Sequence, residues 1–265
     1  MPKQKQIPIA LTIAGSDSGG GAGIQADLKT FAALGVHGTS AITCTTAQNP
    51  RRVLAIQACR PEIVRGQIEA VFEELPPVAI KTGMLFSAEI IRVVADFFRK
   101  HRRIPLVVDP VMISTSGARL LKPSAIKSLK SDLLPKATLV TPNLDEASFL
   151  TERNLKSPEQ LRWAAKEIHE QFGCAALIKG GHLRNSREAI DIFFDGENEL
   201  LLTAPFVKGV HTHGTGCTYS AAVAGYLARG YGLPDAVTQA KEFISQAIAQ
   251  SQGTVRHSVL NSFWR

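Results

Sequence analysis

Short apolar runs of strand length alternate with longer amphipathic segments along this chain of 265 residues, and this order limits the folds open to it. Several of the short runs are apolar without interruption, which is typical of strands covered on both faces. The alternation predicts a mostly parallel sheet that is covered by helices. The expected strands are Ile7–Ala14, Thr39–Thr46, Val78–Thr82, Leu106–Asp109, Thr138–Thr141 and Ala175–Lys179.

A hairpin is expected after the last of these strands. The runs Ala189–Phe194 and Leu200–Thr203 are separated by residues that start with Asp195-Gly196. Asp-Gly is a strong signal for a tight turn between two antiparallel strands. We therefore expect this hairpin on the margin of the sheet.

Two helices have clear signals in the sequence. Apolar residues within Ile24–Phe31 recur at three- and four-residue spacing, so they form one buried stripe of a helix. A second helix is expected to start at Ser157-Pro158, with an N-cap serine, a first-turn proline and Gln160 placed to complete a capping box. Gly173 is expected to end that helix.

The chain gives no sign of a second domain or of a membrane segment. It has no internal repeat, low-complexity tract or long linker, so residues 1–265 are expected to form a single domain. The apolar run Ile7–Ala14 is too short for a signal peptide with its cleavage site. No later stretch approaches the roughly 18 apolar residues of a membrane span, so we expect a cytoplasmic protein with no membrane partner.

The formal net charge of +7 could attract either nucleic acid or phosphorylated metabolites. Basic residues cluster only as short pairs such as Arg51-Arg52 and Arg102-Arg103, with no aromatic residues between them, so no nucleic-acid partner is expected. The four cysteines are far apart and form no C-x-x-C pair, which argues against a disulfide framework and against a structural metal.

Glycines and polar residues gather where the expected strands end. Ligands bind at this edge of open α/β sheets because helix N-termini and loops converge there. The segments that would meet at such a site are Gly15–Gly23, Gln48, Gly83-Met84, Asp109-Pro110, Pro142–Glu146 and Gly180–His182.

The most informative segment is His213–Thr218, which precedes a helix of small residues. Gly214 and Gly216 let backbone N–H groups turn toward one point, and the helix N-terminus adds partial positive charge there. A thiol in that first turn is expected to have a lowered pKa, so Cys217 would supply a thiolate near neutral pH. The alternative is a glycine turn before a packed helix, with an inert cysteine.

Gly214-Thr215-Gly216-Cys217 resembles the anion-hole motif of ribokinase-like kinases, in which Gly-x-Gly precedes a catalytic Asp. A Cys takes that place in the hydroxymethylpyrimidine/phosphomethylpyrimidine kinases of thiamine biosynthesis and in a related group of pyridoxal kinases. The resemblance implies a ribokinase-like three-layer α/β/α sandwich. It also implies that Cys217 deprotonates the substrate hydroxyl, that the amides of Gly214 and Gly216 hold the transferring phosphoryl group, and that Thr215 contacts ATP.

The segment Ala14–Thr30 resembles the substrate-side signature of the same kinases. It is neither a Walker A loop nor a G-x-G-x-x-G motif. The resemblance places Gly15 beside the substrate, and Asp27 is expected to accept hydrogen bonds from a donor-rich ring such as an aminopyrimidine. The alternative is that Asp27 is a solvated acid at the edge of the helix.

Gln48 and Met84 bear on specificity. The amide of Gln48 carries an acceptor and two donors, so it can bind the amine and the ring nitrogen of an aminopyrimidine together. In the similar pyridoxal kinases a Met commonly stands at this position, so Gln48 favours the pyrimidine. Met84 is expected to lie against the ring, although a polar loop Gln and a core Met are common without any ligand.

Four further residues resemble the nucleotide side of the family's site. Asn143 and Glu146 have the spacing of an N-x-x-E motif, which helps to hold magnesium-bound phosphates, often through water. The same spacing also fits a helix-capping Asn with its Glu partner. Asp109 is expected to hold the metal together with Glu146, and Lys179 to contact the ATP phosphates, unless Lys179 only extends from a strand end.

The resemblance implies an enzyme that uses ATP and Mg²⁺ to phosphorylate 4-amino-5-hydroxymethyl-2-methylpyrimidine and then its monophosphate. A homodimer is usual among such relatives, and a monovalent cation is left open as a further cofactor. The first alternative is a pyridoxal kinase with the same Cys loop. Two other classes stay open, a non-catalytic ligand-binding protein on this fold and a cysteine hydrolase that pairs Cys217 with His211 or His213.

Overall fold

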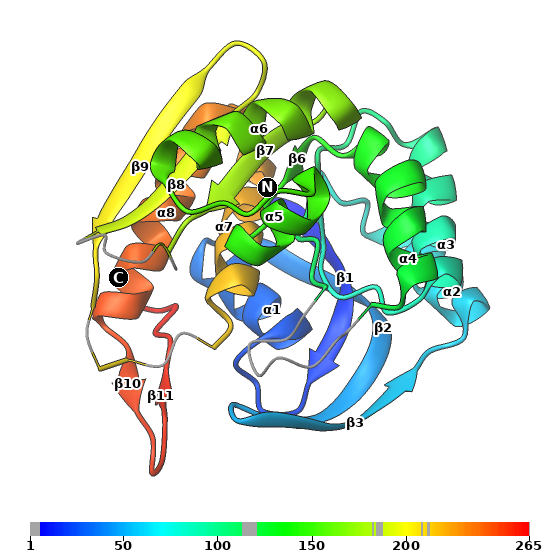
Figure 1. Ribbon diagram of the computed structural model, residues 1–265. Coiled ribbons are helices and arrows are strands. Elements are labelled where there is room, and N and C mark those ends of the chain that lie inside the picture. The colour runs from blue at the N-terminus through cyan, green and yellow to red at the C-terminus, as the bar shows by residue number, and fades with distance from the viewer. Residues whose placement is uncertain are drawn as a thin grey trace.

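The computed structural model describes residues 6–112, 121–181, 183, 188–207, 209–210 and 213–264. Within these ranges, nine strands form one sheet in the order β3-β2-β1-β4-β5-β6-β7-β8-β9 (Figure 1). The strands are β1 (Ile9–Asp17), β2 (His37–Asn49), β3 (Arg52–Ala58), β4 (Ala79–Thr82), β5 (Leu106–Val108), β6 (Leu139–Val140), β7 (Ala175–Lys179), β8 (Glu188–Phe194) and β9 (Glu199–Pro205). The α-helices are α1 (Gly23–Ala33), α2 (Pro61–Glu74), α3 (Ala88–Lys100), α4 (Pro123–Ser128), α5 (Leu144–Thr151), α6 (Pro158–Phe172), α7 (Thr215–Ala228) and α8 (Leu233–Ala249).

The centre of the sheet is parallel and its two margins are antiparallel. β1 pairs in parallel with β2 and β4, and the parallel order continues from β4 through β7. β3 lies antiparallel at one margin, and the β8–β9 hairpin lies antiparallel at the other. The predicted mostly parallel sheet and marginal hairpin are thus confirmed. The parallel order brings the carboxyl ends of six strands to one edge of the sheet.

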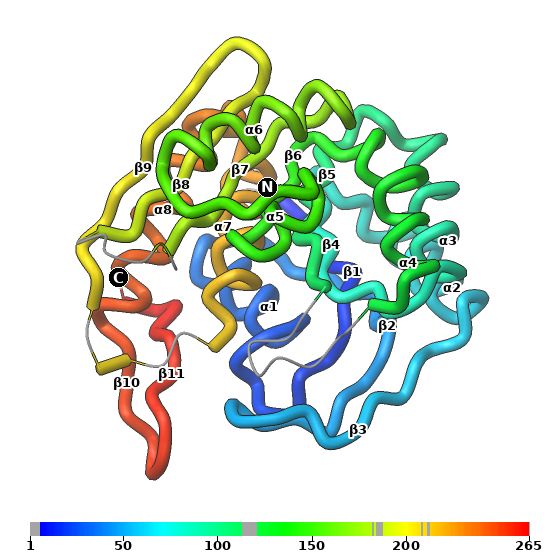
Figure 2. The backbone as a smooth tube through the Cα atoms, viewed as in Figure 1, coloured from blue at the N-terminus to red at the C-terminus, as the bar shows by residue number. Residues whose placement is uncertain are grey.

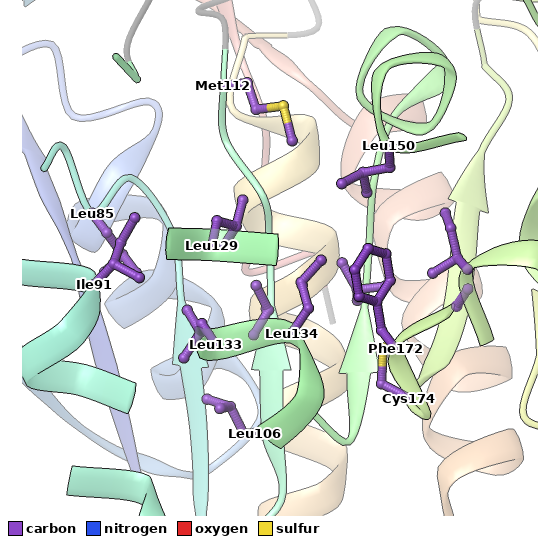
Figure 3. Close-up of a cluster of buried hydrophobic side chains, with 14 of the residues drawn as sticks. Leu85, Ile91, Leu106, Met112, Leu129, Leu133, Leu134, Leu150, Phe172 and Cys174 are labelled. Carbon is purple, nitrogen blue, oxygen red and sulfur yellow. The ribbon is translucent and has the colours of Figure 1, made fainter. Parts of the chain in front are cut away.

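Side chains alternate along the strands into two cores, one on each face of the sheet. In β1, Leu11 and Ile13 belong to a core that is completed by α2 through α6, part of which is drawn in Figure 3. Ala10 of the same strand belongs to the opposite core, which α1, α7 and α8 complete. Both faces of the strands are therefore covered, and the three-layer α/β/α sandwich is confirmed.

Helix α7 carries the candidate anion loop at its N-terminus, and it is buried almost all round. Its residues from Thr218 to Tyr226 are small or apolar and lie inside the molecule, which is typical of a helix in the core rather than on the surface. A Cβ at Gly225 would lie 2.7 Å from Leu34 Cδ1, so the close contact of α7 with the α1 end requires glycine. The burial fixes the position of the helix start.

The edge strand β3 is not among the strands expected from the sequence, and it changes the surroundings of Gln48. Asn49 Oδ1 accepts hydrogen bonds from the amides of Arg51 and Arg52 at 2.9 and 3.1 Å, which closes a tight turn after β2. β2 therefore continues to Asn49 rather than ending at Thr46. Gln48 lies inside a paired strand, beside a register shift, rather than in a loop after it.

Helix α6 begins and ends where the sequence predicts. Ser157 Oγ accepts from the amide of Gln160 at 3.3 Å, and Gly173 ends the helix with a φ of 73°. The capping box differs in one contact, because Gln160 Oε1 accepts from the amide of Lys156 at 2.6 Å instead of the Ser157 amide.

The end of the chain forms a short hairpin of β10 (Gln252–Gly253) and β11 (Ser258–Val259). In Figure 2 this hairpin projects from the body of the molecule below the end of α8. Val255 at its tip is fully in solvent. In the part of the chain that the structure describes, no helix combines the length and the apolar character needed to cross a membrane.

The capping geometry of α6 gives a stability prediction. Ser157→Ala removes the side chain that accepts from the Gln160 amide, so the free energy of unfolding is expected to fall by about 1 kcal/mol. Urea denaturation followed by circular dichroism measures the difference. Ser157→Asp is the matched control, because an aspartate also caps a helix, and it should retain most of the stability.

Candidate active site

A cleft of about 320 Å³ opens at the carboxyl ends of the parallel strands. It is lined by loops and strand ends that are far apart in the sequence, from the first strand to the start of α7. The predicted site residues that line it are Gly15, Gln48, Met84, Asp109, Asn143, Glu146, Lys179, Gly214, Thr215, Gly216 and Cys217. Asp27 is the exception among the predicted residues.

The anion loop, residues 213–217, is shaped by its two glycines. Gly214 is the N-cap of α7 with a φ of 83°, a conformation that strongly favours glycine. A Cβ at Gly216 would lie 3.2 Å from Lys179 Nζ and 3.8 Å from Asp109 Oδ2. The loop therefore lies close to the Lys179 ammonium at Gly216, and a side chain there would crowd that group.

The environment of Cys217 contradicts the expected low pKa of its thiol. Burial raises this pKa to about 11, and the nearby carboxylates of Asp27 and Asp109 act in the same direction. Lys81 and the amide of Gly23, which donates a hydrogen bond to the sulfur, only partly oppose the increase. The helix N-terminus thus does not suffice to make a thiolate at neutral pH in the free protein. Cys217 is half-buried in the wall of the cleft, and the desolvation of its thiol there is the effect that the sequence motif did not reveal.

Asp27 lies beneath the cleft rather than in its wall. The side chain is fully buried, and its two oxygens each accept from Lys81 Nζ at 2.9 Å. Thr12 Oγ1 donates to the same carboxylate at 2.6 Å. The direct contact with a substrate ring that we predicted is therefore not available in this structure, and Asp27 is not the solvated acid of the alternative either.

Lys81 is the site residue that the sequence analysis missed. It lies in the buried strand β4, lines the cleft and is itself fully buried. Burial disfavours its ammonium, but Asp27, Cys217 and Asp109 outweigh that effect and raise the pKa of Lys81, so the side chain stays charged. The signal in the sequence is a lysine inside a run of strand residues whose neighbours Ala79 and Ile80 are apolar, because a buried lysine needs a paired charge.

Lys179 and Asp109 form a second ion pair at the other end of the loop. Lys179 Nζ lies 2.9 Å from Asp109 Oδ1, and Ser220 Oγ donates to Asp109 Oδ2 at 3.3 Å. Burial opposes the ionisation of Asp109, but Lys179 and Lys81 outweigh it and lower the pKa of the carboxyl. The pair carries a fixed positive group at the edge of the cleft.

Asn143 and Glu146 form the capping box that was one of the two readings of their spacing. Asn143 Oδ1 accepts from the amide of Glu146 at 2.9 Å, and Glu146 Oε2 accepts from the amide of Asn143 at 2.9 Å. Both residues also line the cleft, so a helix cap and a ligand role are compatible. Burial raises the pKa of Glu146 to about 7, with Lys179 opposing and Asp109 adding to the increase.

Gly15, Gln48 and Met84 lie along the substrate side of the cleft. A Cβ at Gly15 would lie 2.8 Å from Cys44 Sγ and 3.6 Å from Met84 Sδ, so this wall tolerates no side chain there. Gln48 is held by its backbone, which exchanges two 2.8 Å hydrogen bonds with Ser18 Oγ. Gln48 Oε1 lies 3.2 Å from Thr46 Oγ1, whose hydroxyl also lies 3.0 Å from the carbonyl oxygen of Ser16.

A buried network beneath the far wall of the cleft was also missed by the sequence analysis. Lys241 Nζ of α8 lies 2.7 Å from Asp191 Oδ2 of β8, and the amide of Gly180 donates to Asp191 Oδ1 at 3.0 Å. The network joins α8 to the turn that follows Lys179. The wall above it is mainly apolar and is lined by Ala204, Pro205, Phe206, Val207, Ile244 and Ile248.

The cysteine hydrolase alternative requires a histidine beside Cys217. His211 lies outside the described residues, and so does His182 of the Gly180–His182 segment. The ring of His213 is directed to Asp17, with Nε2 at 3.1 Å from Asp17 Oδ2, while the Cys217 sulfur accepts from the Gly23 amide. Cys217 and His213 therefore do not form the dyad of a hydrolase.

Comparisons with known proteins find close relatives over nearly the full chain. A hydroxymethylpyrimidine/phosphomethylpyrimidine kinase of Rhizobium meliloti is 47% identical over 97% of this chain and 98% of its own length. The thiamine biosynthesis bifunctional protein ThiED of Geobacter sulfurreducens is 47% identical over 91% of this chain, which spans about half (49%) of that protein.

Two solved structures extend the comparison. A phosphomethylpyrimidine kinase from Clostridium difficile has a TM-score of 0.80 and 44% identity, over 91% of this chain and 99% of that one. The ADP complex of Bacillus subtilis pyridoxal kinase has a TM-score of 0.88 and 36% identity, over 97% and 98%.

The sandwich, the cleft at the strand ends and these neighbours define a kinase of the ribokinase-like class. The family described as phosphomethylpyrimidine kinase matches residues 17–260, which is most of the molecule. The chain therefore belongs to the phosphomethylpyrimidine kinase family.

The Asp27–Lys81 pair gives a prediction that separates charge from packing. Lys81→Met leaves the buried carboxyl of Asp27 without its counter-ion, so the free energy of unfolding is expected to fall by roughly 3–5 kcal/mol. Adding Asp27→Asn removes the uncompensated charge, and the double variant should recover a large part of the loss. Urea denaturation of both single variants and the double variant measures the coupling. Strictly additive losses would contradict a direct charge pair.

Proposed function

We propose that this chain transfers the γ-phosphoryl group of ATP to the hydroxymethyl oxygen of 4-amino-5-hydroxymethyl-2-methylpyrimidine, and then to the phosphate of the monophosphate. The observation that carries the proposal is that Cys217 and the anion loop line one cleft together with Gln48 and Lys179. The family membership and the relatives named for both phosphorylations support it.

The anion loop is suited to hold the transferring phosphoryl group. Gly214 and Gly216 place their amides at the start of α7, where the helix adds partial positive charge. Lys179 lies opposite Gly216, so charge developing on the phosphoryl oxygens would meet amides on one side and an ammonium on the other. Phosphoryl transfer depends mainly on such positioning and charge stabilisation.

Cys217 is proposed to accept the proton of the substrate hydroxyl. Because burial raises the pKa of its thiol to about 11, only a small fraction is thiolate at neutral pH, and this fraction grows as the pH rises. Lys81 and the Gly23 amide are the groups in its surroundings that favour the thiolate. In the second transfer the acceptor is a phosphate oxygen that is already largely deprotonated at neutral pH, so that step does not need the thiolate.

The carboxylates of Asp109 and Glu146 fit a magnesium ion that keeps most of its water. Both are hard oxygen ligands, and because burial raises the pKa of Glu146, a nearby cation would favour its ionised form. The described residues contain no group of three or more His, Cys, Asp or Glu side chains that could hold a metal, so water would complete the shell. When bound, Mg²⁺ would neutralise charge on the ATP phosphates.

A pyridoxal kinase activity is the second candidate, because the Bacillus subtilis pyridoxal kinase has a TM-score of 0.88 to this chain. Gln48 favours the pyrimidine, since this residue lines the cleft and its amide can donate to a ring nitrogen. The expected homodimer and cytoplasmic location form part of the proposal. Light scattering of the purified protein tests the first of these.

The role of Cys217 gives a kinetic prediction. Cys217→Ala is expected to lower kcat on the hydroxymethyl pyrimidine by roughly 10²–10⁴-fold, because a positioned base contributes that much. Since the thiol pKa lies near 11, kcat/KM of the wild type should rise with pH between about 7 and 9. Cys217→Asp supplies a base that is ionised throughout this range, so its profile should lose that rise. A coupled assay for ADP measures both variants, and unchanged turnover in Cys217→Ala would exclude the proposed base.

Gln48 gives a prediction on specificity. Gln48→Met removes the polar contacts to an aminopyrimidine, which costs about 1–3 kcal/mol of transition-state binding. The value of kcat/KM for the pyrimidine is expected to fall by the corresponding factor, while kcat/KM for pyridoxal falls less or rises. The measurement compares kcat/KM for the hydroxymethyl pyrimidine with kcat/KM for pyridoxal at saturating ATP. Thr46→Val, which removes the hydroxyl beside the Gln48 carboxamide and its hydrogen bond to the Ser16 carbonyl but leaves Gln48 in place, is the matched control and should change the preference less.

A further inference from the structure

Asp17 organises the glycine loop, residues 17–23, at the end of β1. Its Oδ1 accepts from the amide of Gly19 at 2.8 Å, and its Oδ2 accepts from the amides of Gly21 and Ala22 at 3.2 and 2.9 Å. Burial opposes the ionisation of Asp17, but His213 and these amides outweigh it and lower the pKa of the carboxyl. The loop is thus wrapped around one carboxylate.

The same carboxylate reaches across the cleft to the anion loop. His213 Nε2 lies 3.1 Å from Asp17 Oδ2, and the two side chains are only 13% and 3% exposed. A carboxylate can only accept, so the Nε2–H of His213 is the donor. This is a side-chain link between segments that are 196 positions apart in the sequence.

The backbones of the two loops are in direct contact beside this link. A Cβ at Gly214 would overlap the carbonyl oxygen of Gly21, and a Cβ at Gly21 would lie 2.8 Å from His213 Cδ2. No side chain separates the loops at this point. Their relative position is therefore set by the glycine contact and by the Asp17–His213 hydrogen bond.

The far end of the glycine loop reaches the proposed base. The amide of Gly23 donates to the Cys217 sulfur, and Gly23 forms an isolated bridge with Ser16 next to Asp17. Gly23 has a φ of 57°, which points its amide in a direction that other residues rarely allow. A shift of the loop against α7 would move this donor away from the sulfur.

We infer that Asp17 and His213 are a positioning pair, which seats the glycine loop on the anion loop so that the Gly23 amide is directed at the sulfur of Cys217. Neither residue touches the reacting atoms. The inference rests on the proposed function, because it gives the pair a part in readying the base for transfer. It assigns His213 a task that differs from the hydrolase dyad.

The test compares His213→Gln with His213→Met. The glutamine can place an N–H₂ donor near the position of Nε2, whereas the methionine fills a similar space without a donor. Asp17→Asn is a second variant, and Asp195→Asn is its matched control. Asp195 also accepts from loop amides, those of Glu197 and Asn198, but it lies in the β8–β9 turn away from the cleft.

Two measurements read the result. His213→Met and Asp17→Asn are expected to lower kcat by roughly 10- to 100-fold with little change in the KM for ATP, since misplacement by a fraction of an ångström costs that much. His213→Gln should retain most of the wild-type kcat. Asp195→Asn should leave kcat unchanged.

The second measurement does not depend on turnover. The rate at which iodoacetamide alkylates Cys217, followed by mass spectrometry of its peptide at about pH 8, should fall by about fivefold in His213→Met, the effect of losing one hydrogen bond to the thiolate. His213→Gln should react at nearly the wild-type rate. The other three cysteines serve as internal references.

The two measurements distinguish a failure of the positioning pair from a failure of the proposed function. An equal or faster alkylation of Cys217 in His213→Met would overturn the inference, because it would mean that the Asp17–His213 hydrogen bond holds the two loops together without directing the Gly23 amide at the sulfur. A loss of kcat that is as large in His213→Gln as in His213→Met would also overturn it. If the wild type phosphorylates neither pyrimidine, the proposed function fails, yet the alkylation rates still decide whether the pair positions the amide.

Discussion

The cleft depends on ion pairs in which lysine ammonium groups compensate buried carboxylates. Lys81 neutralises Asp27 beneath the cleft, and Lys179 neutralises Asp109 at its edge. Charges of this kind are costly to bury unless they are paired, so each pair fixes the position of its strand end. β4, β5 and β7 carry three of the four groups at or just after their carboxyl ends, which is why the cleft keeps its shape where the sheet stops. The thiol of Cys217 lies within the field of both pairs.

The fold could be predicted from patterns that repeat along the chain. Continuous apolar runs identified the parallel strands, and Asp195-Gly196 identified the hairpin, because both signals are local. β3 escaped because an edge strand is only partly buried and lacks such a run. The turn at Asn49 that leads into β3 depends on a side-chain hydrogen bond to the backbone, which composition does not reveal.

The candidate site was predictable as a set of positions but not as a set of environments. The order of the strands brought Gln48, Lys179 and Cys217 to one cleft, as parallel topology requires. What each group experiences there depends on its surroundings: desolvation reversed the expected pKa shift of Cys217, and full burial removed Asp27 from the wall. Contacts over long sequence separations, such as Lys81 with Asp27 and His213 with Asp17, have no motif that a single sequence displays.

At the contact between Gly21 and Gly214, the main chain rather than side chains determines the shape of the cleft. Neither position can carry a Cβ without a clash. The distance between the two loops is therefore set by contacts of the main chain, and substitutions at these two positions cannot adjust it. Adaptation to a new alcohol is then expected from other positions that line the cleft with side chains, such as Gln48 on β2 and Met84 after β4. Substitutions are therefore restricted at the glycine contact, whereas the wall that contains Gln48 and Met84 can accept other side chains.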